Sequence, residues 1–157
     1  MAKKAPLGPP LPFKTTEKKE GGTPPIRLFS DGASRGNPGL AGIGVVIELG
    51  DGTVLEGKRF LGKTTNNTAE YEALILGLTM LKERKLFHPL KIYSDSQLMV
   101  RQLIGQYKIK QPHLKKLAGK VHGLLKLFPS HEIIHIPRGE NKRADKLANE
   151  AIDKRST

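Results

Sequence analysis

Residues 26–61 read IRLFSDGASRGNPGLAGIGVVIELGDGTVLEGKRFL, and this stretch decides the expected fold. It contains three short apolar runs, IRLFSD, LAGIGVVIEL and TVLEGKRFL, which are separated by Gly, Pro, Asn and Asp. Such runs between turn-forming residues are typical of β-strands. The Asp51-Gly52 step indicates a hairpin between the second and third runs. We therefore predict three consecutive antiparallel strands.

Downstream of this stretch, helical and strand-like patterns alternate. The predicted elements are a helix at 69–81, a strand at 90–95, helices at 96–104 and 112–127, a strand at 131–136 and a helix at 141–152. A helix between two strands implies a crossover connection, which makes the strands parallel. The expected fold class is therefore α/β, with a mixed five-stranded sheet of three antiparallel and two parallel strands and with helices on both faces.

Composition narrows the class of protein. The 157 residues suit one domain, and the net charge of +12 favours a polyanionic partner such as nucleic acid. Cysteine is absent, which excludes disulfides and thiolate metal sites and fits a reducing, cytoplasmic location. Because no apolar run reaches the length of a membrane span, we expect no membrane partner.

The two ends of the chain differ from its middle. Residues 1–25 hold six of the eleven prolines and the charged patch KTTEKKE, without helical or strand periodicity. Such a segment cannot bury enough apolar area to become ordered. We predict a disordered Pro/Lys-rich N-terminal tail at 1–25, a folded domain at 26–153 and a short C-terminal tail at 154–157.

Two carboxylates stand where strands are expected to end. Asp31 closes the run IRLFSD and Asp95 closes LKIYSD, each two residues after an aromatic side chain, Phe29 or Tyr93. If the crossover makes these strands parallel neighbours, both acids emerge at one edge of the sheet. Open α/β sheets bind their ligands at this edge.

Two further acids lie on the expected inner faces of helices. Glu70 precedes Ala73 and Leu74 by three and four residues and so extends an apolar stripe. Asp145 lies along the inner margin of the last helix, three residues before Ala148. A charge in such a position needs a specific reason.

Each acid also has an ordinary structural interpretation. Asp31 could serve a turn, Glu70 could close a capping box with Asn67, Asp95 could cap the following helix, and Asp145 could be solvated. A cluster of four is harder to explain, because carboxylates about 5 Å apart repel by roughly 3 kcal/mol per pair at an effective dielectric near 20. Divalent cations would compensate. Hard oxygen ligands suit Mg²⁺ or Mn²⁺, and two such ions about 4 Å apart can activate water and stabilise the leaving oxygen during attack on a phosphate.

Four segments of the chain resemble the signature blocks of type 1 ribonuclease H. They are FSDGASRGNPG, TTNNTAEYEAL, YSDSQLMV and ENKRADKLANEA, in the family's order and with one acid in each. The resemblance runs from about residue 26 to 153. It implies that Asp31, Glu70, Asp95 and Asp145 are catalytic acids that hold two Mg²⁺ ions, with Mn²⁺ as a substitute. The implied activity is endonucleolytic cleavage of the RNA strand of an RNA–DNA hybrid, which leaves 5′-phosphate and 3′-hydroxyl ends and would remove RNA primers.

The same resemblance implies a set of substrate contacts. One group approaches the RNA minor groove and its 2′-hydroxyls, which distinguish RNA from DNA; a second holds DNA phosphate and bases; a third follows the third acid towards the RNA. By matching positions, the minor-groove group consists of Gly32, Ser34 and Asn37. The group that holds the DNA strand consists of Lys63, Thr65, Asn66 and Asn67, and the residue that follows the third acid is Gln97.

The chain departs from the best-known bacterial members of the family. The segment IPRGENKRAD is short and lacks the loop His that many members carry before the last acid, while His135 lies upstream on a strand. Arg138 occupies the loop but is permanently charged and cannot act as a general base, so we assign it phosphate binding or electrostatic action on the product side. The Trp-containing basic protrusion is also missing, and the lysine-rich segment YKIKQPHLKKLAGK stands in its place. The resemblance is thus to a compact variant.

Two other functions remain open at this point. One is a non-catalytic module that binds hybrid or double-stranded RNA, favoured by the lysine-rich segment and the missing His. The other keeps the fold but cuts DNA, as transposases, integrases and junction resolvases do; the TAEYEAL and YSDS blocks argue against it. A nucleotide phosphate loop at DGASRGNPG is disfavoured because the segment leads into a strand and not a helix. We expect a monomer.

Overall fold

A computed structural model describes residues 23–155 of the chain. Its elements, in chain order, are β1 (Ile26–Gly36), β2 (Gly39–Glu48), β3 (Val54–Thr64), α1 (Asn66–Glu83), β4 (Leu90–Ser94), α2 (Gln97–Leu103), α3 (Pro112–Leu125), β5 (His131–His135), the 3-10 turn η1 (Arg138–Glu140) and α4 (Lys142–Lys154). Residues 1–22 and 156–157 lie outside the described range, so the predicted tails stay predictions.

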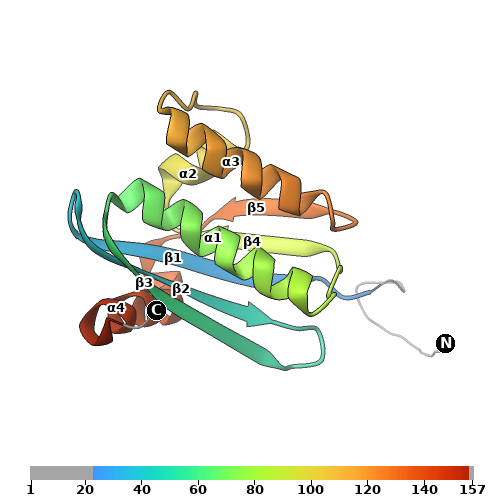
Figure 1. Ribbon diagram of the computed structural model, residues 1–157. Helices are drawn as coiled ribbons and strands as arrows, with labels where there is room; N and C mark the ends of the chain where they lie inside the picture. Colours follow the sequence, from blue (N-terminus) through green and yellow to red (C-terminus); the bar gives the residue numbers. More distant parts are fainter. Residues whose placement is uncertain (1–22, 156–157) are drawn as a thin grey trace.

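The sheet has the predicted composition. Its strand order is β3-β2-β1-β4-β5. The hairpin-connected strands β1, β2 and β3 pair antiparallel, whereas β4 and β5 add to the β1 edge in parallel. Helices α1 and α3 lie on one face and α4 on the other (Figure 1). The expected α/β class, with three antiparallel and two parallel strands, is confirmed.

Strand β1 is longer than the sequence pattern predicts. We placed its end at Asp31, but its pairing with β2 continues to Gly36↔Gly39. The prediction was wrong because a long hairpin with regular pairing turns the polar, glycine-rich segment DGASRG into strand, although this composition is typical of loops. Asp31, Gly32 and Ser34 therefore lie on a paired strand.

The helix caps settle two of the open interpretations. Helix α1 begins before the predicted residue 69, and its N-cap is Thr65, whose side chain accepts from the Thr68 N–H. Glu70 is thus not part of a capping box with Asn67. Helix α2 is capped by Ser96, whose hydroxyl accepts from the Met99 N–H, so Asp95 does not cap it. Both acids are free for another role.

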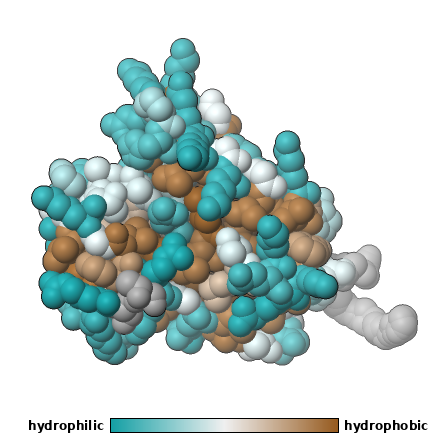
Figure 2. Space-filling view, in the orientation of Figure 1, coloured by the Kyte–Doolittle hydropathy of each residue, from teal (hydrophilic) through white to brown (hydrophobic). Residues whose placement is uncertain are grey.

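The main hydrophobic core lies between the sheet and the helices α1 and α3. It contains fully buried side chains from β1, β4 and α1, among them Leu28, Ile92 and Leu78. Tyr71 is also fully buried, and its hydroxyl donates to Gln102 Oε1 over 2.8 Å. Figure 2 shows this side of the molecule, with hydrophilic side chains projecting over the α2–α3 end at the top of the view.

The opposite face is covered by α4 at very short range. A Cβ atom added to Gly42 would clash with the backbone carbonyl of Ala148, and one added to Gly44 would clash with that of Ala144. Glycine at these two positions of β2 lets the helix backbone lie directly on the strand. In residues 23–155, no helix combines the length and apolar character that a membrane crossing requires.

Candidate metal and active site

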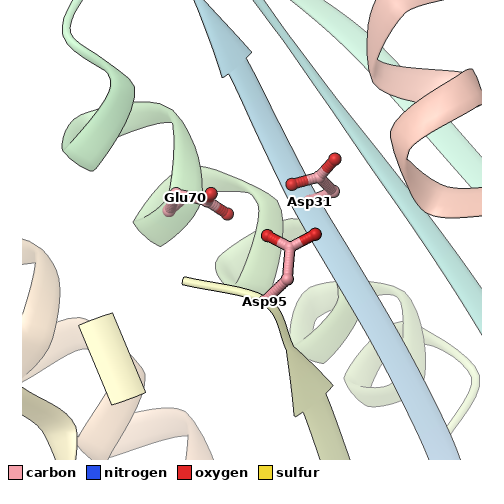
Figure 3. Close-up of side chains that lie close together, drawn as sticks. All are labelled: Asp31, Glu70 and Asp95. Carbon is pink, nitrogen blue, oxygen red and sulfur yellow. The ribbon is translucent and has the colours of Figure 1, made fainter. Parts of the chain in front are cut away.

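Three carboxylates meet at the carboxyl ends of the parallel strands. The last residue pair between β1 and β4 is Ser30↔Ser94, and Asp31 and Asp95 each follow directly. The preceding aromatic rings, Phe29 and Tyr93, stack with centroids 4.7 Å apart. Glu70 joins the two aspartates from the first turns of α1 (Figure 3). Each acid offers an oxygen, and these oxygens all lie within 4.8 Å of one another.

Burial makes the ionised form of this cluster unfavourable in the absence of a cation. Asp31 and Glu70 are each 4% exposed. Desolvation, followed by repulsion from Glu70 and Asp95, raises the pKa of Asp31 to about 10. Desolvation and repulsion from Asp95 raise the pKa of Glu70 to about 8, although a backbone hydrogen bond from Gly32 works in the opposite direction. Without a cation, the cluster therefore holds protons at neutral pH.

Glycine at position 32 allows Glu70 to reach the cluster. A Cβ atom at Gly32 would clash with the backbone of Ala69 and Glu70, so a side chain there would push α1 away from β1. Beyond Ser30, strand β1 has lost its β4 partner, which leaves the Gly32 N–H unpaired by the sheet. This N–H donates to Glu70 Oε1 over 3.0 Å.

Asp145 lies beside the group of three. It projects from the first turn of α4 and lines the same cleft as Asp31, Glu70 and Asp95. A hydrogen bond between the Asp145 and Asp31 side chains contributes to the raised pKa of Asp31. Asp145 is also 3.9 Å from the guanidinium of Arg138. The predicted fourth acid is therefore at the site, although it is not one of the three that share the tightest grouping.

The other predicted contact residues divide into two sets. Four line the cleft with the acids, and five do not. Those that line it are Gly32, Ser34, Asn66 and Arg138. Those that do not are Asn37, Lys63, Thr65, Asn67 and Gln97.

Two of the five residues outside the cleft have a clear local role beside it. Asn37 Oδ1 accepts from the Asn66 N–H over 3.1 Å, which ties the β1–β2 turn to the start of α1. Thr65 caps the same helix. Lys63 and Gln97 are exposed. All five stay predictions as substrate contacts.

Sequence reasoning missed several residues of the site. Ala33, Arg35, Ser96 and Asn149 line the cleft, and the buried Asn141 contacts Asp95 from behind it. The two asparagines could have been found, because they stand four residues before and after Asp145 and so share its helix face. Arg35 carried no such signal, since its place depends on the long β1–β2 hairpin.

The donor set fits hard divalent cations. It consists of carboxylate oxygens, the ligands that Mg²⁺ and Mn²⁺ prefer, and it contains no sulfur. The raised pKa values of Asp31 and Glu70 point to a cation as well, because the ionised cluster has no positive charge to balance it. A bound cation would supply it.

The missing loop His has no histidine substitute among the residues that line the cleft. His135 is exposed at the end of β5. Arg138 in η1 lines the cleft, and its side chain is 82% exposed. The cleft therefore carries a permanent positive charge at an exposed position on its rim, next to Asp145.

The comparisons with known proteins agree with this geometry. The family described as "Reverse transcriptase-like" matches residues 29–151. The chain is 43% identical over 129 residues to "Ribonuclease HI" of Halobacterium salinarum, covering 82% of this chain and 64% of that protein. It spans only 35% of the length of each of its mycobacterial relatives, among them a bifunctional protein of Mycobacterium tuberculosis.

Two crystal structures are similar over nearly their whole length. The RNase H1 of Halobacterium salinarum superposes with a TM-score of 0.78 at 42% identity, covering 83% of this chain and 99% of that one. LC11-RNase H1 in complex with an RNA/DNA hybrid gives a TM-score of 0.77 at 47% identity, covering 83% and 98%. Both likenesses extend well beyond the acidic cluster.

Proposed function

Because this chain belongs to the type 1 ribonuclease H family, we propose that it is a metal-dependent endonuclease that hydrolyses the RNA strand of RNA–DNA hybrids. The observation that carries the proposal is the grouping of Asp31, Glu70 and Asp95, whose oxygens lie within 4.8 Å at the edge of a sheet of this fold. The products would carry 5′-phosphate and 3′-hydroxyl ends.

Asp31, Glu70, Asp95 and Asp145 are the residues that would hold two Mg²⁺ ions, with Mn²⁺ as a substitute. Ions bound there would activate water and neutralise the charge that develops on the leaving oxygen. The chain's own contribution is to fix the acids. Strands β1 and β4 set Asp31 and Asp95 side by side, and the Gly32 N–H holds one oxygen of Glu70.

The hybrid would lie across the cleft with its RNA strand over Gly32 and Ser34. These residues sit on a paired strand, and the Ser34 hydroxyl donates to the Thr64 carbonyl over 3.0 Å, so the surface is held in one shape. A fixed surface suits recognition of 2′-hydroxyls and of a particular groove width. LC11-RNase H1, which is similar to this chain, has been crystallised with an RNA/DNA hybrid.

Phosphate binding would fall to exposed cations around the cleft. Arg138 lies on its rim, and we assign it to the phosphate next to the scissile bond because guanidinium binds phosphate in bidentate fashion. Lys63 and the amide of Asn66 would hold the DNA strand beside the start of α1. Asn37, Thr65, Asn67 and Gln97 complete the proposed contacts. A cytoplasmic location and a monomeric state stay predictions.

The test is a cleavage assay on an end-labelled hybrid with and without Mg²⁺. We expect shortened RNA only when the divalent ion is present, and no cleavage by Asp31→Asn, which should still bind the hybrid. An Asp31→Asn variant that turns over like the unaltered protein would refute the assignment of the acids. An all-DNA duplex serves as the substrate control, and its cleavage would favour a DNA nuclease of the same fold.

A non-catalytic binding module is the alternative function. It is favoured by five exposed lysines at the α2–α3 end, Lys108, Lys110, Lys115, Lys116 and Lys120. A pure binder would shift hybrid or double-stranded RNA in a gel without shortening either, whatever ion is present.

A further inference from the structure

Three polar side chains follow one another along one side of α4 and its N-cap, and two of them, Asp145 and Asn149, line the cleft. Asn141, Asp145 and Asn149 follow one another at intervals of four residues, which places them on one face of the helix. Asn141 is the N-cap residue of α4, and its side chain makes no capping hydrogen bond. Its carboxamide instead makes hydrogen bonds to β1 and to Asp95.

Asn141 joins the two parallel strands behind the acids. It is 2% exposed, and its amide nitrogen donates to the Ser30 carbonyl over 2.9 Å and to Asp95 Oδ2 over 3.4 Å. An amide nitrogen carries two hydrogens, so it can serve both acceptors. The reverse orientation would set the amide oxygen against a carbonyl and a carboxylate. The orientation of the side chain is therefore fixed, although its oxygen has no hydrogen-bond partner among residues 23–155.

Asn149 holds the fourth acid in a similar way. Its amide nitrogen donates to Asp145 Oδ1 over 3.2 Å and to the Asp145 carbonyl over 3.0 Å. Its amide oxygen accepts from the guanidinium of Arg35 over 3.2 Å. Arg35 is held in turn by Asp153 at 2.8 Å. Because a cation engages the oxygen, the nitrogen must point at Asp145.

We propose that Asn141 and Asn149 are positioning residues of the metal site, which orient Asp95 and Asp145 through their carboxamide nitrogens. This inference rests on the proposed function and adds to it a source of order for two of the four acids. Neither asparagine touches the reacting atoms. Each gives a hydrogen bond to a carboxylate oxygen, which limits the rotation of that carboxylate.

The test measures metal binding directly, by calorimetric titration of the cation-free, full-length protein with Mn²⁺ in the absence of hybrid. The variants are Asn149→Ala and Asn141→Ala, which remove the donors. Asn149→Gln keeps an amide at a spacing from which it can reach Asp145. Lys146→Ala is the matched control, because this exposed residue lies on the same helix.

We expect Asn149→Ala and Asn141→Ala to bind Mn²⁺ at least about 10-fold more weakly, as is usual when a partner of a metal ligand is removed. Asn149→Gln should recover most of the affinity, and Lys146→Ala should match the unaltered protein. Cleavage by Asn149→Ala should need a correspondingly higher Mg²⁺ concentration for half-maximal rate and should approach the normal rate at saturation.

A purely structural role would give a different result. Asn149→Ala would then have a lower Tm but an unchanged Mn²⁺ affinity, and this outcome would overturn the proposal for that residue. If Asn141→Ala does not fold, Asn149→Ala and its Gln counterpart decide the matter alone. Failure of the proposed function is distinguishable, because the unaltered protein would then neither bind Mn²⁺ nor cleave hybrid.

Discussion

Two buried regions of this molecule lie within a few residues of each other and follow opposite rules. Leu28 on β1 belongs to the core beneath α1 and α3, where its buried neighbours are almost all apolar. Asp31, three residues further along the same strand, is 4% exposed and faces Glu70, Asp95 and Asp145. The first region gains free energy from burial, and the second loses it.

The difference shows where this fold gives up stability for chemistry. Apolar burial is worth about 25 cal/mol per Å², whereas a buried carboxylate near others must either take up a proton or find a cation. The acidic cluster keeps its place because the strands, the Gly32 N–H and α4 are all fixed by packing elsewhere. Substitutions in the two regions should therefore have opposite effects on stability.

Asp31→Asn should separate the two regions most sharply. We expect hybrid cleavage to fall by at least about 10³-fold, equivalent to about 4 kcal/mol in the barrier. The reason is that the substitution neutralises the carboxylate that contacts the other three acids. Steady-state rates in Mg²⁺ measure the loss. A variant that retained more than a tenth of the activity would mean that the cluster is not the catalytic centre.

Leu28→Ala should act in the reverse sense. It removes a fully buried side chain from the core, so the free energy of unfolding should fall by about 3 kcal/mol. Urea denaturation measures this change. The Mg²⁺ concentration that gives half-maximal cleavage should stay the same in the folded fraction, and a large shift in it would show that core and site are not independent.

The pH dependence of stability sharpens the comparison further. The pKa of Asp31 is raised from 3.8 to about 10, and that of Glu70 from 4.5 to about 8. Above about pH 4.5 the unfolded chain has released these protons and the folded chain has not, so stability falls as pH rises towards the folded-state pKa values.

In chelator-containing buffer, Asp31→Asn should therefore be more stable than the unaltered protein by several kcal/mol at pH 8, and by less, roughly 1–2 kcal/mol, at pH 5. Denaturation at the two pH values measures both differences. Added Mg²⁺ should raise the Tm of the unaltered protein and leave that of the variant nearly unchanged. Equal stability of the two proteins at pH 8 would contradict the raised pKa.

Gly32→Ala should have a smaller effect that touches both regions. The new Cβ would clash with the backbone of Ala69 and Glu70, so α1 must shift. We expect a loss of roughly 1–3 kcal/mol in stability, typical of overpacking, together with weaker Mn²⁺ binding because Glu70 moves with the helix. Ala33→Gly, one residue along, is a control that adds no atoms.

The smallest effect should come from the surface ion pairs. Arg27 and Glu48 approach to 2.9 Å, but their side chains are 50% and 38% exposed. Glu48→Gln should therefore change the free energy of unfolding by less than about 1 kcal/mol and should not affect metal binding. A larger loss at low salt would show that Arg27, which also lies over the rings of Phe29 and Tyr93, steadies the strands beneath the acids.

Much of this fold could be predicted from the sequence because its signals are local. Apolar periodicity and turn residues predicted the strands and α-helices of residues 23–155 in the correct order, although not the 3-10 turn η1, and the crossover rule predicted that β4 and β5 are parallel. The meeting of Asp31 with Asp95 followed from the same rule. Glu70 was expected to be buried because of its place on the apolar stripe of α1, and it is.

The errors arose where tertiary pairing overrides composition. The segment DGASRG has the residues of a loop, yet the hairpin with β2 makes it strand. The hydrogen bonds of Asn141 to Ser30 and Asp95, and the position of Arg35 beside α4, depend on how the last helix is seated against the sheet. No local pattern gives that seating, which depends on contacts between residues more than a hundred positions apart.

The glycines of β2 have a consequence for how this site could change over evolution. Because Gly42 and Gly44 let α4 rest on bare backbone, a single methyl group at either position would lift the helix and carry Asp145 outwards as a rigid unit. Substitutions at these two positions would thus change the spacing between Asp145 and the other three acids, although the positions themselves carry no charge and face no substrate. The preference for one ion over another could therefore change without replacement of any ligand, because the size of the side chains at positions 42 and 44 sets the distance between the ligands.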